Sequence, residues 1–117
     1  MLEKYVYSAV VTHAYDGDTI HAEVSLGFDL KVKETFRLAR INAPEITGAS
    51  RDRGILSRDF VREKILGKQV TIKTYKDGRE KYGRYLADIF FFNDTTQKTI
   101  CLNDLLVEVA LAEYKEY

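Results

Sequence analysis

The stretch "ASRDRGILSRDFVREKILG", residues 49–67, decides the fold, because it interrupts a series of strand-like segments with a helical pattern. Its apolar residues recur at the spacing of one helix face. Ser50 or Asp52 is placed to cap the start of this helix, and Gly67 is a typical stop signal. The apolar positions are Leu56, Phe60, Val61 and Ile65. We therefore expect one amphipathic helix here.

Strand-like segments rich in β-branched and aromatic residues lie on both sides of this helix. They are Tyr5–Thr12, Thr19–Leu26, Val32–Ile41, Gln69–Tyr75 and Arg84–Phe92. A second helical pattern, "ICLNDLLVEVALAEY" at residues 100–114, closes the chain. This order predicts a fold that is mainly β with α: a five-stranded Greek-key barrel of the OB type, with a helix between strands 3 and 4 and a C-terminal helix.

The closing helical pattern contains the only cysteine of the chain, Cys101. We interpret it as a buried small side chain rather than a reactive thiol, and a single cysteine excludes an intramolecular disulfide framework. Asn103 or Thr99 is placed to cap this helix. Its expected apolar face consists of Leu102, Leu105, Leu106 and Val109.

Length and charge set broad limits. A chain of 117 residues suits one domain, residues 1–117, with its own core. Lysine plus arginine equals aspartate plus glutamate, 18 each, so the net charge gives no argument for nucleic acid. Basic residues are in excess between residues 62 and 84, where a solvated face and a phosphate-binding face explain the pattern equally well.

The first 16 residues hold no apolar run long enough for a signal peptide or a membrane span. If Met1 is the natural start, we expect a cytoplasmic protein without a membrane partner. A secreted protein whose leader has been removed would look the same.

The stretch "DGDT", residues 16–19, places two carboxylates either side of a glycine. A hairpin turn explains this Asp-Gly pair, and also Asp77-Gly78, without any chemistry. Asp18 distinguishes the first copy, because carboxylates two residues apart on an extended chain project to one side and repel unless a cation is near. The second copy has Arg79 in that place, so we expect a plain turn there.

The stretch "TFRLARINAPEITG", residues 35–48, is harder to explain by packing. Arg37 alternates with apolar residues, and Pro44 stiffens the strand exit that carries Asn42 and Glu45. Rigid loops that leave a barrel commonly carry oxygen ligands and bases. Farther along, Arg84 begins the last strand in "KYGRYLA", residues 81–87. If the two strands meet, the two guanidiniums would converge on one phosphate, which their planar forks bind well.

In order and spacing, "DGDT", "FRLARINAPE", the helix, "KYGRYLA" and "LNDLLVEVALA" resemble the staphylococcal nuclease (thermonuclease) family over nearly the whole chain. The resemblance implies an SNase-like OB-fold enzyme that cleaves DNA and RNA phosphodiesters with calcium (Ca2+) and leaves 3′-phosphate products. No base-reading motif is visible, so we expect little sequence specificity. Aromatic stacking would favour single-stranded or frayed substrate. We expect a monomer.

Carried over position by position, the resemblance implies that Asp18 is a calcium ligand, with Asp16 in the same acidic turn. Asn42 occupies the second ligand position, and Ala43 would lend its backbone carbonyl. The best-known members carry aspartate where this chain has Asn42, so one negative charge is lost and weaker calcium binding is expected.

The resemblance further implies that Glu45 is the catalytic glutamate, which orients and deprotonates the attacking water. Arg37 and Arg84 match the catalytic arginines that stabilise the transition state. Lys81 and Tyr82 match residues that meet substrate phosphates.

Two other interpretations remain. One is a non-catalytic single-stranded nucleic-acid or protein binding module of the same fold; retention of Arg37, Glu45 and Arg84 argues against it. The other is a plain barrel with surface charges, which makes the matched positions a coincidence. His13 and His21 flank the first turn, and without a third ligand we interpret them as surface or packing residues.

Overall fold

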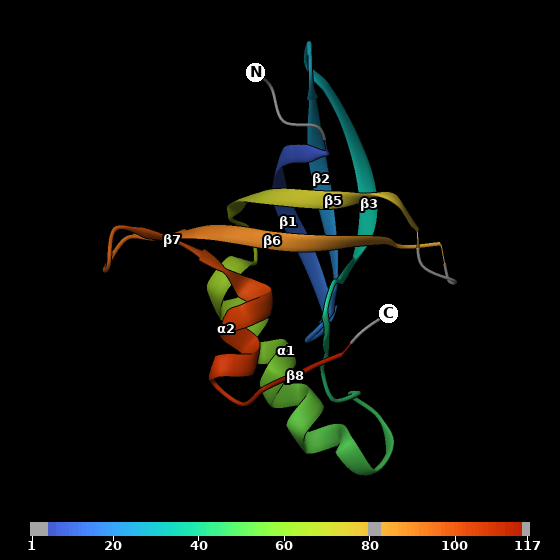
Figure 1. The fold of residues 1–117 in the computed structure, drawn as a ribbon, viewed down its shortest axis with the longest axis vertical. Coiled ribbons are helices and arrows are strands. Elements are labelled where there is room, and N and C mark those ends of the chain that lie inside the picture. Colours follow the sequence, from blue (N-terminus) through green and yellow to red (C-terminus); the bar gives the residue numbers. More distant parts are fainter. Residues whose placement is uncertain (1–4, 80–82, 116–117) are drawn as a thin grey trace.

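Five strands of the computed structural model, which describes residues 5–79 and 83–115, close into a barrel (Figure 1). The strands run in the order β3-β2-β1-β5-β6, and a parallel pairing of β3 with β6 closes the ring. The other neighbouring pairs in this ring are antiparallel. Their bounds are β1 (Val6–Asp16), β2 (Thr19–Gly27), β3 (Leu30–Leu38), β5 (Gln69–Arg79) and β6 (Tyr85–Asn93). The predicted OB-type barrel is confirmed.

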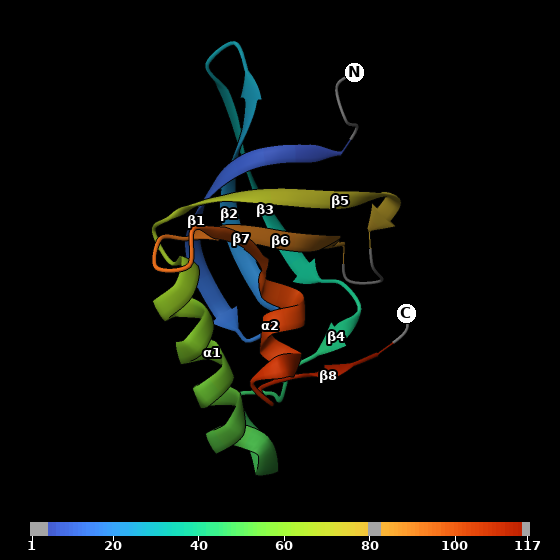
Figure 2. The same cartoon turned by 60° about the vertical axis from the view of Figure 1, so that its left-hand side comes forward.

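Two helices cover one end of this barrel. Helix α1 (Arg51–Ile65) follows a 3₁₀ turn, η1 (Gly48–Ser50), and helix α2 (Leu102–Glu108) lies close to the C-terminal end. Figures 1 and 2 show both helices on the same side of β5 and β6. The helix predicted between the third and fourth long strands is therefore present, as is the C-terminal one. No helix of the described residues has the length and apolar character needed to cross a membrane.

Helix α1 buries a narrower and more polar stripe than its sequence suggested. Val61 and Ile65 are fully buried as expected, whereas Leu56 is 61% exposed. Gly54 and Ser57 occupy the rest of the buried face. Small residues at these positions allow the helix to approach the loops at the barrel end closely.

The capping prediction is confirmed in position for α1 and is wrong for α2, whose N-cap is Cys101. Ser50 holds the N-cap position of α1, but its hydroxyl donates to the carbonyl oxygen of Glu45 at 3.0 Å and accepts no hydrogen bond from a helix N–H. Asn103 lies inside α2 and is fully buried. Val109 follows the end of α2 and is exposed.

Cys101 ends a short strand, β7 (Lys98–Cys101), instead of lying in the helix. Its side chain is partly buried, less than the sequence predicted. Partial burial nevertheless raises the pKa of the thiol, which agrees with an unreactive cysteine.

The turn between β1 and β2 is formed by Gly17 and Asp18, with Asp16 paired to Thr19. Neither turn residue has a positive φ, whereas a type I′ turn requires it at both positions. Gly17 is needed for a different reason: a Cβ there would lie 2.7 Å from the Cβ of Ser57 and 2.9 Å from the Cβ of Ala43. The glycine therefore lets the acidic turn pack against α1.

The second Asp-Gly pair does not form the predicted turn. Asp77 and Gly78 lie within β5, which continues to Arg79 and pairs there with Tyr85. The register of β5 against β6 shifts between Thr74 and Arg79, so the pair lies in an irregular part of the strand. Besides β7, the described residues contain two further short strands that were not predicted, β4 (Ile41–Asn42) and β8 (Glu113–Tyr114), which pair with each other.

Candidate functional site

A buried acidic side chain, Asp18, lies at the centre of the candidate site. It is only 6% exposed, and its Oδ2 accepts a hydrogen bond from the backbone N–H of Ala43 at 2.8 Å. The backbone carbonyl of Asp18 accepts from the N–H of Leu38 at 2.8 Å. The turn after β1 is thereby fixed against both the end of β3 and the strand exit that follows.

Asp16 is held close to Asp18 by the same turn. Its Oδ1 accepts the backbone N–H of Asp18 at 3.0 Å. The pKa of Asp18 is raised to about 7, first by burial and then by the hydrogen bond and negative charge of Asp16. Arg37 and the N–H of Ala43 act in the opposite direction. Asp16 thus disfavours the ionisation of Asp18.

Arg37 connects Asp18 to Asn42. Its Nη2 lies 3.2 Å from Oδ2 of Asp18 and donates to Oδ1 of Asn42 at 3.3 Å, while Nη1 donates to the carbonyl of Leu38 at 2.8 Å. Arg37 is itself only 7% exposed. An arginine on an apolar strand is therefore explained by a buried carboxylate beside it, since a buried charge needs a partner.

Arg84 contacts Thr19, the residue that follows Asp18. Its Nη1 donates to Oγ1 of Thr19 at 2.9 Å. Tyr85, the next residue, pairs with Phe36 where β6 meets β3. The predicted meeting of these strands therefore brings Arg37 and Arg84 to two consecutive residues, Asp18 and Thr19.

Glu45 lies on the strand exit and is exposed. It lines a pocket of about 330 Å³ together with Asn42 and Ala43. The backbone of Glu45 is fixed by Ser50 and by Gly54, at which an added Cβ would overlap the Glu45 carbonyl. Helix α1 thus holds the backbone of an exposed carboxylate in place.

The donors near Asp18 have the chemistry that calcium prefers. Two carboxylates, Asp16 and Asp18, lie in one turn, and the amide oxygen of Asn42 contacts the same nitrogen of Arg37 as Asp18 does; hard cations such as calcium bind oxygen ligands of these kinds. Ala43 contacts Asp18 through its N–H. Within residues 5–79 and 83–115, no three His, Cys, Asp or Glu side chains form a group suited to a metal ion. The donor types therefore fit calcium, with fewer charges than a typical strong site.

Other residues singled out in the sequence lie elsewhere. Lys81 and Tyr82 fall outside the described residues. His13 and His21 are paired across β1 and β2, with ring centroids 5.5 Å apart.

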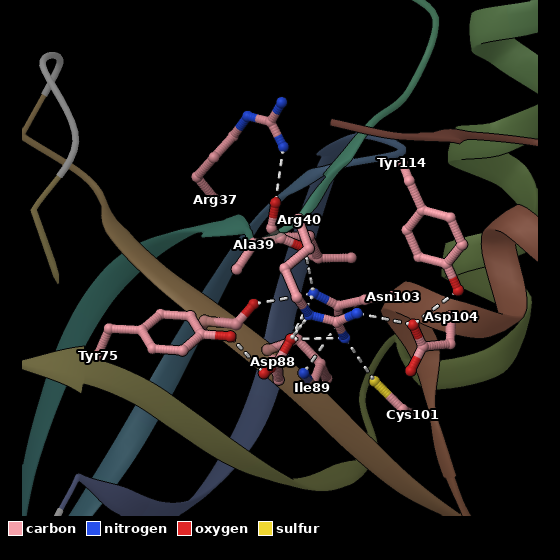
Figure 3. A network of polar contacts seen from close by, with 12 residues as sticks. Arg37, Ala39, Arg40, Tyr75, Asp88, Ile89, Cys101, Asn103, Asp104 and Tyr114 are labelled. Atoms are coloured by element: carbon pink, nitrogen blue, oxygen red, sulfur yellow. Dashed lines mark hydrogen bonds and ion pairs between the residues drawn. The ribbon is translucent and has the colours of Figure 1, made fainter. Parts of the chain in front are cut away.

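A second polar cluster, which the sequence did not reveal, joins the barrel to α2 (Figure 3). Arg40 contacts Asp88 at 3.0 Å and Asp104 at 2.9 Å. Tyr75 donates to Asp88 at 2.6 Å, and burial and this hydrogen bond raise the pKa of Tyr75 to about 12. One feature of the sequence could have indicated this cluster: Asn103 is a polar residue in an otherwise apolar helix face. Buried polar groups are usually hydrogen-bonded, so an asparagine there predicts polar partners nearby.

Comparison with known proteins gives one result that bears on this site. The family model described as "Staphylococcal nuclease homologue" matches residues 35–117, a range that contains Arg37, Asn42, Glu45 and Arg84. No curated protein matches the chain. Because the match extends over well more than half of the sequence and agrees with the observed barrel, this chain belongs to the staphylococcal nuclease homologue family.

Proposed function

We propose that the protein is a calcium-dependent nuclease that hydrolyses DNA and RNA phosphodiesters with little sequence specificity. The observation that carries the proposal is the approach of two arginines, Arg37 and Arg84, to the consecutive residues Asp18 and Thr19. Two guanidiniums fixed at one barrel end form a binding site for a single phosphate group.

Each side chain has a separable role in this proposal. Arg37 and Arg84 stabilise the negative charge that accumulates on the phosphate oxygens during attack. Glu45, exposed at the edge of a pocket, orients a water and accepts its proton. The bond to the 5′ oxygen of the next nucleotide breaks and that oxygen leaves as a hydroxyl, so the phosphate stays on the 3′ oxygen of the preceding nucleotide.

Calcium, when bound by Asp16, Asp18, Asn42 and the Ala43 carbonyl, would supply positive charge beside a phosphate oxygen. The chain itself orders these donors before any ion is bound. Ala43 holds Asp18, and Arg37 holds both Asp18 and Asn42. A bound cation would offset the negative charge of Asp16 and Asp18.

A second function is favoured by one observation, the neutral side chain at Asn42. With one acidic ligand fewer, the same site would bind a single strand through its arginines without cleaving it. The nuclease and the binding module differ only in whether the strand is cleaved, so a cleavage assay with the Glu45→Gln variant distinguishes them.

The decisive experiment compares the wild type with Glu45→Gln on single-stranded DNA and RNA, with calcium or with chelator. We expect cleavage to require calcium and to fall by about 10²–10⁴-fold in the variant, as is typical when a general base is lost. Glu63→Gln is the control, because Glu63 is an exposed carboxylate on α1 outside the pocket. Cleavage that ignores both chelator and Glu45→Gln would refute the proposal. Binding without any cleavage would establish the non-catalytic function.

The remaining details need two further measurements. Removal of the new terminal phosphate by a 3′-phosphatase would confirm 3′-phosphate products. Equal cleavage of a stable duplex and a single strand would exclude the preference for single strands that aromatic stacking suggests.

A further inference from the structure

A polar pocket of about 560 Å³ lies beside Arg84, on the side of β1, β2 and β3 that faces away from the core. Ala14, Ile20 and Ala22 point into the barrel and are buried. Because side chains alternate along a strand, His13 and His21 point to the opposite, outer side. The pocket is lined by the polar side chains of Thr12, His13, His21, Lys33, Thr35 and Arg84.

Three of these side chains form a transverse row over three neighbouring strands. His13 is paired with His21, and His21 is paired with Thr35. The two imidazole rings are 5.5 Å apart, and Oγ1 of Thr35 lies 3.1 Å from Nδ1 of His21. With Nδ1 engaged by Thr35, Nε2 is the ring nitrogen that His21 has left for a ligand.

The row leads directly to the candidate catalytic arginine. Thr35 precedes Phe36, and Phe36 pairs with Tyr85, the residue after Arg84. Arg84 lines the pocket while its Nη1 contacts Thr19 in the acidic turn. A chain-like ligand whose phosphate lies at Arg84 would therefore pass over the row on leaving the site.

The chemistry of the row suits a phosphate. Hydroxyl, imidazole, ammonium and guanidinium groups all offer hydrogen-bond donors, and Lys33 and Arg84 add positive charge. Among the described lining residues there is one carboxylate, Glu34, so the pocket is not acidic overall. The one apolar side chain of this described lining is the methyl group of Ala22, which is buried.

We propose that the row of His13, His21 and Thr35, together with Lys33, binds the backbone phosphate next to the one that is cleaved, in a single-stranded polynucleotide. This inference rests on the proposed nuclease function, which it deepens by giving the direction in which the substrate strand leaves the site. His13 and His21 act as binding residues with no part in the chemical step.

The test is binding of a fluorescent single-stranded oligothymidylate, measured by anisotropy with chelator present so that no cleavage occurs. We expect the double variant His13→Ala/His21→Ala to bind about threefold to tenfold more weakly, the effect of losing one or two hydrogen bonds. Lys33→Gln should reduce the slope of log K against log salt by about 0.7, the value for one phosphate contact on a single strand. Lys98→Gln, the same charge change on the exposed start of β7, should leave both quantities unchanged.

Each outcome decides the proposal. Equal binding by the wild type and both variants overturns it, and so does a wild type that does not bind the oligonucleotide. The binding assay does not depend on catalysis, so a protein that fails to cleave in the Glu45 experiment still tests the row.

Where cleavage occurs, the histidine variants should raise KM more than they lower kcat, because this contact is the same before and during the reaction. Thermal unfolding of each variant shows whether it is folded, and His13→Gln/His21→Gln provides a milder replacement.

Discussion

The carboxylate of Asp18 and the guanidinium of Arg37 face each other at 3.2 Å in the interior of the barrel end. A buried ion pair is weak support for stability, because desolvation of both groups offsets their attraction. Here the acidic partner also lies beside Asp16, which raises its pKa further. The ion pair of Asp18 and Arg37 therefore contributes little to the free energy of unfolding, which is common for charged groups of functional sites.

The first prediction concerns Asp18→Asn and the dependence of stability on pH. The pKa of Asp18 is about 7 in the folded protein and near 3.8 when unfolded, so the folded state binds this proton more tightly. Between these values, stability falls as the pH rises, and above pH 7 the whole unfavourable contribution is present. Without calcium, we expect Asp18→Asn to increase the free energy of unfolding at pH 8 by about 1–3 kcal/mol and to have little effect below pH 4. Urea unfolding at several pH values measures this, and an unchanged pH profile would contradict it.

The sequence is sufficient to predict the barrel, because five strand patterns and one interrupting helix pattern have a clear order and periodicity. It is not sufficient for β4 and β8, which are two residues each and form only because segments far apart in the chain meet. Asp77 and Gly78 show another limit, because they lie in an irregular part of β5 where the register against β6 shifts, and the local sequence predicts a turn instead.

The resemblance to a known family predicts which residues form the candidate site. It does not predict how these residues contact one another. Nothing in the chain order indicates that Thr19 would receive Arg84, or that Gly17 is required by the packing of α1. The contacts of Arg40 with Asp88 and Asp104 likewise depend on a tertiary arrangement of separate elements.

The second prediction concerns Gly54, which presses against the backbone of Glu45. A Cβ at Gly54 would overlap the Glu45 carbonyl, so the strand exit must move to accept it. We expect Gly54→Ala to lower kcat by about 10²-fold, the scale of a displacement near 1 Å, despite the better helix propensity of alanine. Leu56→Ala, on the exposed face of the same helix, is the control. Wild-type kcat in Gly54→Ala would show that the position of Glu45 is not critical.

The third prediction concerns the neutral ligand position. Asn42→Asp adds one negative charge beside Arg37 and Asp18, and the number of charged ligands sets calcium affinity. We expect the calcium concentration for half-maximal cleavage to fall by about tenfold, with the same change in a calorimetric titration. Asn93→Asp makes the same charge change at the end of β6, beside the turn that leads to β7, and should have no effect. An unchanged calcium requirement in Asn42→Asp would remove Asn42 from the ligands.

The last prediction concerns Asn103, which joins α2 to the barrel strands (Figure 3). Its Nδ2 donates to the carbonyls of Ala39 and Ala87 at 2.9 and 3.0 Å, and its Oδ1 accepts the N–H of Ile89 at 3.0 Å. Asn103→Ala would remove this partner from the N–H of Ile89 and the carbonyl of Ala39, while the carbonyl of Ala87 keeps the N–H of Ala39, so we expect the free energy of unfolding to fall by about 2–4 kcal/mol.

The matched control for Asn103→Ala is Asn93→Ala, which removes an amide that accepts two backbone N–H groups in an exposed turn. Water can replace those partners, so the loss should stay below about 1 kcal/mol. Chemical denaturation of both variants gives the comparison. A similar loss in the two variants would mean that the buried groups around Asn103 find other partners, and that α2 is held to the barrel by its apolar contacts alone.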